Sequence, residues 1–366
     1  MEATEPAETA TPATPTGGTP PQPGQPPTGP RAKVRRRTLL LGALGLAAVT
    51  VTLAEIESRA GDDEPRKIVF TVPDGHALSV AFSPDGKTLV AGLSGVRGIN
   101  STLRSWNLAK GTSTTPWPDQ VEEVTKVAFS PDGRTLAVAG TLQVALWNAA
   151  KPTGVALPLP TLDLAFSPDG RKLATGGRDG AARLWNLATG TVTDTLTAKG
   201  MTVVNAVAFR PDGYALATGS EDLADSHVRL WDLEAVFSPT VHATLEAPYW
   251  HSMKPVAFSP VGQLLATGSA DPLVRVWDSV SGALEATLTG HTGSVTAVAF
   301  SPDGATLATG SEDKTVRLWS TSSHDVVPVA TLTGHTDTVT SVAFSPDSAT
   351  VASGSLDGTV RLWPNW

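Results

Sequence analysis

Short apolar runs of four to seven residues, separated by turn residues, follow one another along most of the chain. Near residues 286–320 the runs "ATLT", "VTAVAFS", "TLATGS" and "TVRLWS" are separated by "GH", "SPDG" and "SEDK". The Asp-Gly pair permits the positive φ that a tight hairpin needs. The runs are apolar at more than one face, which is typical of strands buried on both sides. The pattern therefore predicts a unit of four short strands.

This unit recurs along the chain with a regular spacing. Close copies of "VAFSPDG" contain the phenylalanines Phe82, Phe129, Phe166, Phe209, Phe258, Phe300 and Phe344. A tryptophan follows each of them after 18 to 24 residues, namely Trp106, Trp147, Trp185, Trp231, Trp277, Trp319 and Trp363. Self-similarity at a period of about 40 residues is the signature of a repeat architecture. Seven copies therefore predict seven equivalent structural units.

The repeated motifs resemble those of the WD-repeat β-propeller family. The units contain Gly-His, Ser-Pro-Asp-Gly and a terminal Trp-Asp or Trp-Asn pair, although the last two copies read "WS" and "WP". The resemblance covers residues 66–366, about four-fifths of the chain. It implies an all-β fold: a single seven-bladed β-propeller whose blades are four-stranded antiparallel sheets.

The end of the chain tests this expectation, because the sequence stops three residues after Trp363. The last blade would then lack its fourth strand and present an open edge. Residues 66–72, "RKIVFTV", precede the first repeat and have the composition of a strand. In the resembled family the N-terminal segment completes the final blade, so we expect this segment to close the ring.

Polar residues also recur from copy to copy. An aspartate stands six residues before the tryptophan at Asp179, Asp225, Asp271, Asp313 and Asp357. A residue needed once for chemistry would not be needed in five blades, so we interpret these residues as structural. The resemblance implies a hydrogen-bonded chain from His to Ser or Thr to Asp, joined by the indole N–H, in His291, Thr309, Asp313, Trp319, His335, Ser353, Asp357 and Trp363. The arginines two residues before the tryptophans are expected to place their charged heads in solvent. They are Arg104, Arg183, Arg229, Arg275, Arg317 and Arg361.

Candidate partner-binding residues lie outside this repeated set. Trp117, Tyr249 and Trp250 precede the innermost strands of their blades, in connections that the resemblance places on one face of the ring. Exposed aromatic residues suit partner binding, but they suit gap filling between blades equally well. The resemblance also implies that the positions before the repeated aspartates face this surface, and those include Arg178, Glu221, Glu312 and Leu356.

The first 65 residues differ in composition. Residues 1–30 are rich in Pro, Thr and Ala without an aromatic residue, and we expect them to be disordered. Residues 31–54 join the basic "RAKVRRR" to 17 uncharged residues at 38–54, which predicts a transmembrane or signal helix with its N-terminus in the cytoplasm. The stretch also resembles a bacterial twin-arginine export signal, so a membrane anchor and a secreted, cleaved form both remain open. Residues 55–65 are expected to be a linker, and the propeller is expected outside the cytoplasm.

Composition narrows the possible functions. The chain has no cysteine, which excludes disulfides and thiolate chemistry, and its net charge of −8 argues against nucleic acid as a partner. No phosphate-binding loop, metal-ligand pair or nucleophile elbow is present, so we expect no cofactor and no metal. The prediction is a monomeric, non-catalytic scaffold that binds a protein or peptide. The alternative is a propeller that binds or converts a small molecule in its central channel.

Overall fold

The computed structural model describes residues 68–72, 75–95, 102–115, 123–148, 151–222, 226–235, 238–246, 255–261, 263–322, 326–364 and 366. The chain divides into two units, Met1–Val49 and Thr50–Trp366, and all described residues belong to the second. The predicted tail, apolar segment and linker lie outside the described residues. Among the described residues, no helix is long and apolar enough to cross a membrane.

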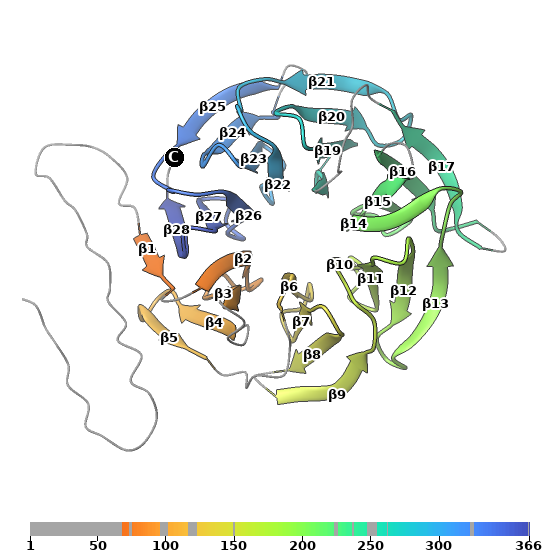
Figure 1. The fold of residues 1–366 in the computed structure, drawn as a ribbon, viewed down its shortest axis with the longest axis horizontal. Coiled ribbons are helices and arrows are strands. Elements are labelled where there is room, and N and C mark those ends of the chain that lie inside the picture. The colour runs from red at the N-terminus through yellow and green to blue at the C-terminus, as the bar shows by residue number, and fades with distance from the viewer. Residues whose placement is uncertain are drawn as a thin grey trace, which may run out of the picture. The chain divides into compact units, whose positions relative to one another are not determined.

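The described residues form seven four-stranded antiparallel sheets arranged as blades of a ring (Figure 1). We number the blades 1 to 7 in chain order. Blade 1 contains β2 (Gly75–Phe82), β3 (Thr88–Gly95), β4 (Thr102–Asn107) and β5 (Thr112–Thr114); blade 2 contains β6 (Lys126–Phe129), β7 (Thr135–Ala139), β8 (Val144–Asn148) and β9 (Lys151–Leu157); blade 3 contains β10 (Asp163–Phe166), β11 (Lys172–Gly176), β12 (Ala182–Asn186) and β13 (Thr191–Leu196). The first strand of each blade lies nearest the centre of the ring (Figure 1).

The remaining blades follow the same order. Blade 4 contains β14 (Met201–Phe209), β15 (Ala215–Asp222), β16 (Ser226–Asp232) and β17 (Thr240–Leu245); blade 5 contains β18 (Val256–Phe258), β19 (Leu264–Gly268), β20 (Val274–Asp278) and β21 (Leu284–Leu288); blade 6 contains β22 (Val295–Phe300), β23 (Thr306–Ser311), β24 (Val316–Ser320) and β25 (Val327–Leu332). Blade 7 contains β26 (Val339–Phe344), β27 (Thr350–Ser355), β28 (Thr359–Pro364) and β1 (Ile68–Thr71). The all-β, seven-bladed fold expected from the sequence is therefore confirmed.

The seam of the ring is the pairing of β1 with β28. The two strands are antiparallel, with Val69 opposite Arg361 and Phe70 opposite Val360. The Phe70 ring also stacks on Trp106 of blade 1, with ring centroids 4.9 Å apart. The N-terminal strand thus completes blade 7, as expected, and also packs against the neighbouring blade.

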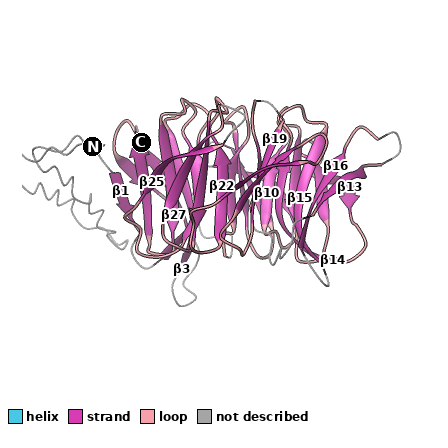
Figure 2. Ribbon diagram, turned by 90° about the horizontal axis from the view of Figure 1, so that it is seen from above, coloured by secondary structure: helices cyan, strands magenta, loops and turns pink. Residues whose placement is uncertain are grey.

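The core lies between blades. In one buried cluster Trp106 of blade 1 packs with Ala352, Val360 and Leu362 of blade 7. The second strands are buried almost throughout, because neighbouring blades cover both of their faces. Trp366, which the repeat pattern does not place, packs edge-on against Phe344 with ring centroids 5.4 Å apart. These contacts hold neighbouring blades together, and the loops lie at both ends of the strands (Figure 2).

Candidate functional site

The repeated polar residues of blade 6 form one hydrogen-bonded chain. The Trp319 indole Nε1 donates to Thr309 Oγ1 at 2.9 Å, and Thr309 Oγ1 lies 2.8 Å from His291 Nε2. On the other side of the imidazole ring, His291 Nδ1 lies 2.7 Å from Asp313 Oδ2. Because a carboxylate only accepts, Nδ1 carries the proton and donates.

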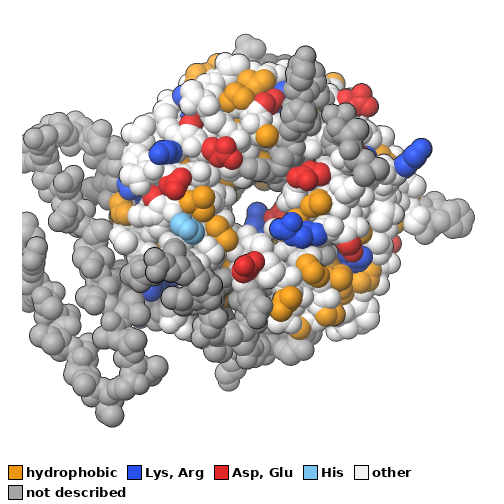
Figure 3. Space-filling model, viewed as in Figure 1, with side chains coloured by type: hydrophobic (Ala, Val, Ile, Leu, Met, Phe, Trp, Pro, Cys, Tyr) orange, Lys and Arg blue, Asp and Glu red, His pale blue; other side chains and the backbone are white. Residues whose placement is uncertain are grey.

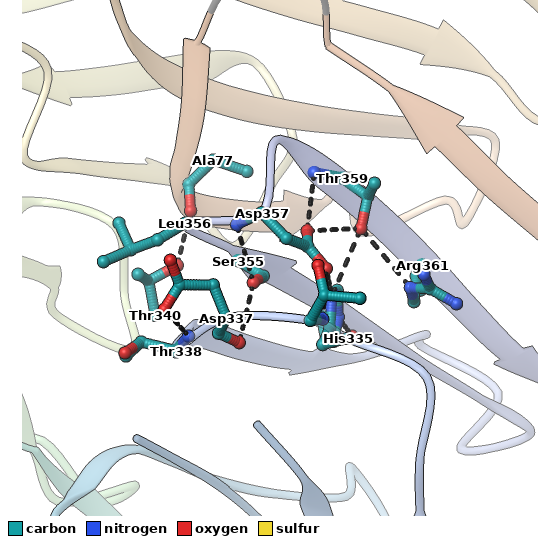
Figure 4. A network of polar contacts seen from close by, with 12 residues as sticks. Ala77, His335, Asp337, Thr338, Thr340, Ser355, Leu356, Asp357, Thr359 and Arg361 are labelled. Atoms are coloured by element: carbon teal, nitrogen blue, oxygen red, sulfur yellow. Dashed lines mark hydrogen bonds and ion pairs between the residues drawn. The ribbon is translucent and has the colours of Figure 1, made fainter. Parts of the chain in front are cut away.

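Blade 7 repeats this chain. Trp363 Nε1 donates to Ser353 Oγ at 2.8 Å, and Ser353 Oγ lies 2.7 Å from His335 Nε2. His335 Nδ1 then donates to Asp357 Oδ2 at 2.9 Å, within the network that Figure 4 shows. The two histidine side chains are only 1% exposed. Both sets of predicted residues are therefore occupied by bonds inside their own blades.

Electrostatics keep His291, Asp313 and Asp357 in one protonation state near neutral pH. Burial lowers the pKa of His291, although the hydrogen bond to Asp313 opposes this effect. Burial would raise the pKa of Asp313, but hydrogen bonds from Thr315, His291 and the Thr292 amide outweigh it and lower the pKa to about 2. Burial would also raise the pKa of Asp357, but hydrogen bonds from His335 and Thr359 outweigh this effect and hold the pKa well below its usual value. In blade 6 the pair is therefore a neutral imidazole and a carboxylate, held together in the interior.

In blades 3 to 5 an arginine forms an ion pair with the aspartate. Arg183 Nη2 lies 2.5 Å from Asp179, Arg229 Nη2 lies 2.6 Å from Asp222, and Arg275 Nη2 lies 2.7 Å from Asp271. Arg229 and Arg275 are only 6% and 5% exposed. The expectation that these charged heads lie in solvent is wrong for these two arginines, because the partly buried Asp222 and Asp271 hold them inside the blade.

The rule of six residues before the tryptophan did not identify Asp222. Counting back six residues from Trp231 leads to Asp225, which lies outside the described residues. Aligning "GSED" forward from Gly219 places Asp222 where blade 6 has Asp313, and three inserted residues follow it. In the structure Asp222 also lies 3.2 Å from Ser220 Oγ, which donates to it. Forward alignment of the second strand could have identified it.

Blade 2 lacks an acceptor for its tryptophan. The Trp147 indole Nε1 is buried and has no hydrogen-bond partner in the described part of the chain. Blades 3 to 7 place Thr or Ser opposite the strand residue two before tryptophan, whereas blade 2 has Val138 opposite Ala145. The missing hydroxyl leaves a buried donor unpaired.

The predicted partner-binding residues fall into two groups. Trp117, Tyr249 and Trp250 lie outside the described residues, so their role stays a prediction. The others stand at or just beyond the end of the second strand of their blades, and they are Arg178, Glu221, Glu312 and Leu356. Arg178 and Glu312 are exposed, while Glu221 and Leu356 are half-buried. Since these strands are equivalent, the four residues belong to one face of the ring, which we call the upper face.

The central channel contains a cavity of about 300 Å³ lined by the innermost strands. Lys126 Nζ lies 3.0 Å from Asp163 Oδ1 there, and Asn205 Nδ2 donates to Glu221 Oε1 at 2.8 Å. Within the described residues, no group of three or more His, Asp or Glu side chains is arranged to hold a metal ion.

A family match agrees with this geometry. The sequence matches the WD40 family, described as WD domain, G-beta repeat, over residues 66–107, 114–148, 160–186, 190–232, 254–278, 282–320 and 326–364. The chain belongs to the WD40 family. Each matched WD40 segment ends at or just after the third strand of a blade, and the first begins just before β1. No curated protein matches the chain by sequence.

Proposed function

We propose that this WD40 propeller is a non-catalytic scaffold that binds a protein or peptide on its upper face. The observation that carries the proposal is that the repeated His and Asp side chains form hydrogen bonds inside their own blades. His291 and His335 bond to a buried hydroxyl on one side and to a carboxylate on the other, which leaves neither ring nitrogen for a substrate. A general acid or base must instead reach the proton that it transfers.

The upper face offers the groups that a protein partner would contact. Arg178 and Glu312 present charges of opposite sign, and Ser294 Oγ donates to Glu312 Oε2 at 2.7 Å, which orients this carboxylate. Leu356 adds an apolar contact, and its main-chain N–H donates to the Thr338 carbonyl at 3.0 Å. Fixed groups lose little conformational entropy on binding. The predicted aromatic residues Trp117, Tyr249 and Trp250 would supply the large contact areas typical of binding hot spots.

We further propose that residues 38–54 tether the propeller to a membrane and place it outside the cytoplasm. This rests on the sequence, where five basic residues precede 17 uncharged ones. A helix of that length spans about 25 Å, which suits a slightly thinned bilayer. The secreted form, after cleavage, is the alternative.

The scaffold proposal is tested by proximity cross-linking of the tagged full-length chain in the cells that produce it. We expect Arg178→Glu, Glu312→Arg and Leu356→Glu to remove the same cross-linked protein. Arg134→Glu is the matched control, because Arg134 is highly exposed in a Ser-Pro-Asp-Gly turn at the opposite end of the strands. Equal loss with Arg134→Glu, or no loss with any of the three upper-face variants, would contradict the proposal.

A further inference from the structure

The inner strands of blades 2 and 3 carry a charge at a position where the other five blades carry small, uncharged residues. The position three residues before the repeated phenylalanine is Lys126 in blade 2 and Asp163 in blade 3. In the remaining five blades it is Ser79, Ala206, Pro255, Ala297 and Ser341. Since the repeat does not require charge at this position, Lys126 and Asp163 are specific to this part of the channel.

These charges are held in place by other groups. Asp163 is buried, and its Oδ2 accepts the Val207 amide N–H of blade 4 at 2.9 Å while Oδ1 contacts Lys126. Lys126 remains partly exposed to the channel, so its ammonium has donors directed at the cavity as well as at Asp163. Asn205 holds Glu221, which lines the same cavity. One wall therefore presents a fixed cation next to fixed carboxylates on consecutive blades.

The rest of the cavity lining is uncharged. Leu78, Pro255 and Val298 contribute some apolar surface, whereas Thr125, Thr296 and Ser341 contribute hydroxyl groups, and most of the exposed surface is polar. The Thr340 hydroxyl donates to the Ala77 carbonyl of blade 1. Figure 3 shows the open channel at the centre of the ring, with basic and acidic side chains at its rim.

We propose that this cavity binds a small zwitterion, namely a free amino acid with an uncharged side chain. The carboxylate of the ligand is held by the Lys126 ammonium. Its ammonium group is held by the carboxylates of Asp163 and Glu221, and its side chain lies against the uncharged part of the lining.

Size and charge both favour this class of ligand. A cavity of about 300 Å³ is at the lower end of ligand pockets, which suits a molecule of amino-acid size and not a cofactor. A ligand with both charges replaces the water on the cation and on the carboxylates by charge-assisted hydrogen bonds. A simple carboxylic acid or a simple amine would satisfy only one side of the wall.

The test is isothermal titration of the purified full-length chain in mild detergent with L-leucine as the probe. Two analogues each lack one charge of the zwitterion, since N-acetyl-leucine has no ammonium and leucinamide has no carboxylate. We expect saturable binding of leucine, with affinity at least tenfold weaker for both analogues, because each loses a charge-assisted contact. No binding of leucine, or equal binding of either analogue, would overturn the proposal.

Variants assign the binding to the channel. Lys126→Met and Glu221→Gln are each expected to weaken leucine binding at least tenfold. Glu221→Gln keeps the shape of the side chain and an acceptor for Asn205, so it covers the case in which Lys126→Met destabilises the ring. Lys87→Met removes an exposed lysine in a turn of blade 1 and is expected to leave binding unchanged. Unchanged binding in the folded Glu221→Gln protein, or equal loss in Lys87→Met, would refute the site.

Discussion

The unpaired indole of blade 2 allows a stabilising substitution to be predicted from the repeat itself. In blades 3 to 7 the tryptophan Nε1 donates to a Thr or Ser hydroxyl at 2.8 to 2.9 Å. Blade 2 has Val138 at that position, and Trp147 Nε1 has no partner among the described residues. The substitution Val138→Thr replaces one methyl group by a hydroxyl without adding a heavy atom.

The magnitude follows from the two groups involved. A buried donor without an acceptor costs about 1 to 3 kcal/mol, and the new bond would recover part of this. Burying the hydroxyl also has a cost, but in blade 6 the same hydroxyl contacts the opposite carbonyl, that of Arg317, at 3.4 Å. In blade 2 the opposite residue is Ala145. We expect a net stabilisation of about 1 kcal/mol, or roughly 2 °C in the melting temperature.

The assay is thermal unfolding followed by circular dichroism, with Thr218→Val as the reverse substitution in blade 4. Thr218 accepts the Trp231 N–H at 2.9 Å, so its loss should destabilise the protein by about 1 to 3 kcal/mol. If Thr218→Val lowers the melting temperature but Val138→Thr does not raise it, the added hydroxyl does not serve as an acceptor for Trp147 and the reasoning fails.

Three further predictions concern protonation, the buried arginines and the N-terminal segment. The pKa of Asp313 is lowered to about 2, so its contribution of about 2 kcal/mol is present above pH 4 and lost as the pH falls from about 4 to about 2 in chemical unfolding. The lowered pKa of His291 acts in the same direction, because the unfolded chain gains a proton below about pH 6.5 while the buried imidazole stays neutral. Arg275→Met leaves the partly buried Asp271 without its ion-pair partner, although Ser269 and Leu273 still donate to it, and should destabilise the protein by about 3 kcal/mol in urea unfolding. Deletion of residues 31–54 should move the protein from the carbonate-resistant membrane pellet to the supernatant.

Each of these predictions has its own control. The variant Asp313→Asn should lose most of the pH dependence between pH 4 and pH 2, and an unchanged profile would remove Asp313 as its source. The exposed pair of Lys87 and Asp85, 3.6 Å apart, should contribute at most about 1 kcal/mol. A loss in Lys87→Met as large as that in Arg275→Met would contradict the distinction between buried and exposed pairs. Retention in the pellet after the deletion would exclude residues 31–54 as the anchor.

The sequence predicts the fold well because every blade repeats the same short sequence motifs. Seven Phe and Trp anchors set the number of blades, and the missing last strand identified residues 66–72 as the closing strand, which the structure describes as β1 at 68–71. The polar chain was predictable for His291 and His335 because both copies are complete.

The polar contacts that differ from blade to blade were harder to predict. Arg229 and Arg275 have the same spacing as Arg104, and their burial depends on the aspartates that the loops bring beside them. In blade 4 an insertion shifts that aspartate to Asp222, which spacing from the tryptophan cannot detect. The charges at Lys126 and Asp163 were visible as departures from small residues, but their meeting in the channel depends on the order of the blades.

The closure of the ring by its N-terminal strand can be measured directly, because the chain has no cysteine of its own. Val69 and Arg361 face each other across β1 and β28, so Val69→Cys and Arg361→Cys together should form one intramolecular disulfide under mild oxidation. We predict loss of both free thiols and a shifted monomer band on a non-reducing gel. A pair of Val69→Cys with the remote, exposed Tyr214→Cys should keep both thiols. Two reactive thiols in the first pair, or only cross-linked dimers, would contradict a ring closed at this seam.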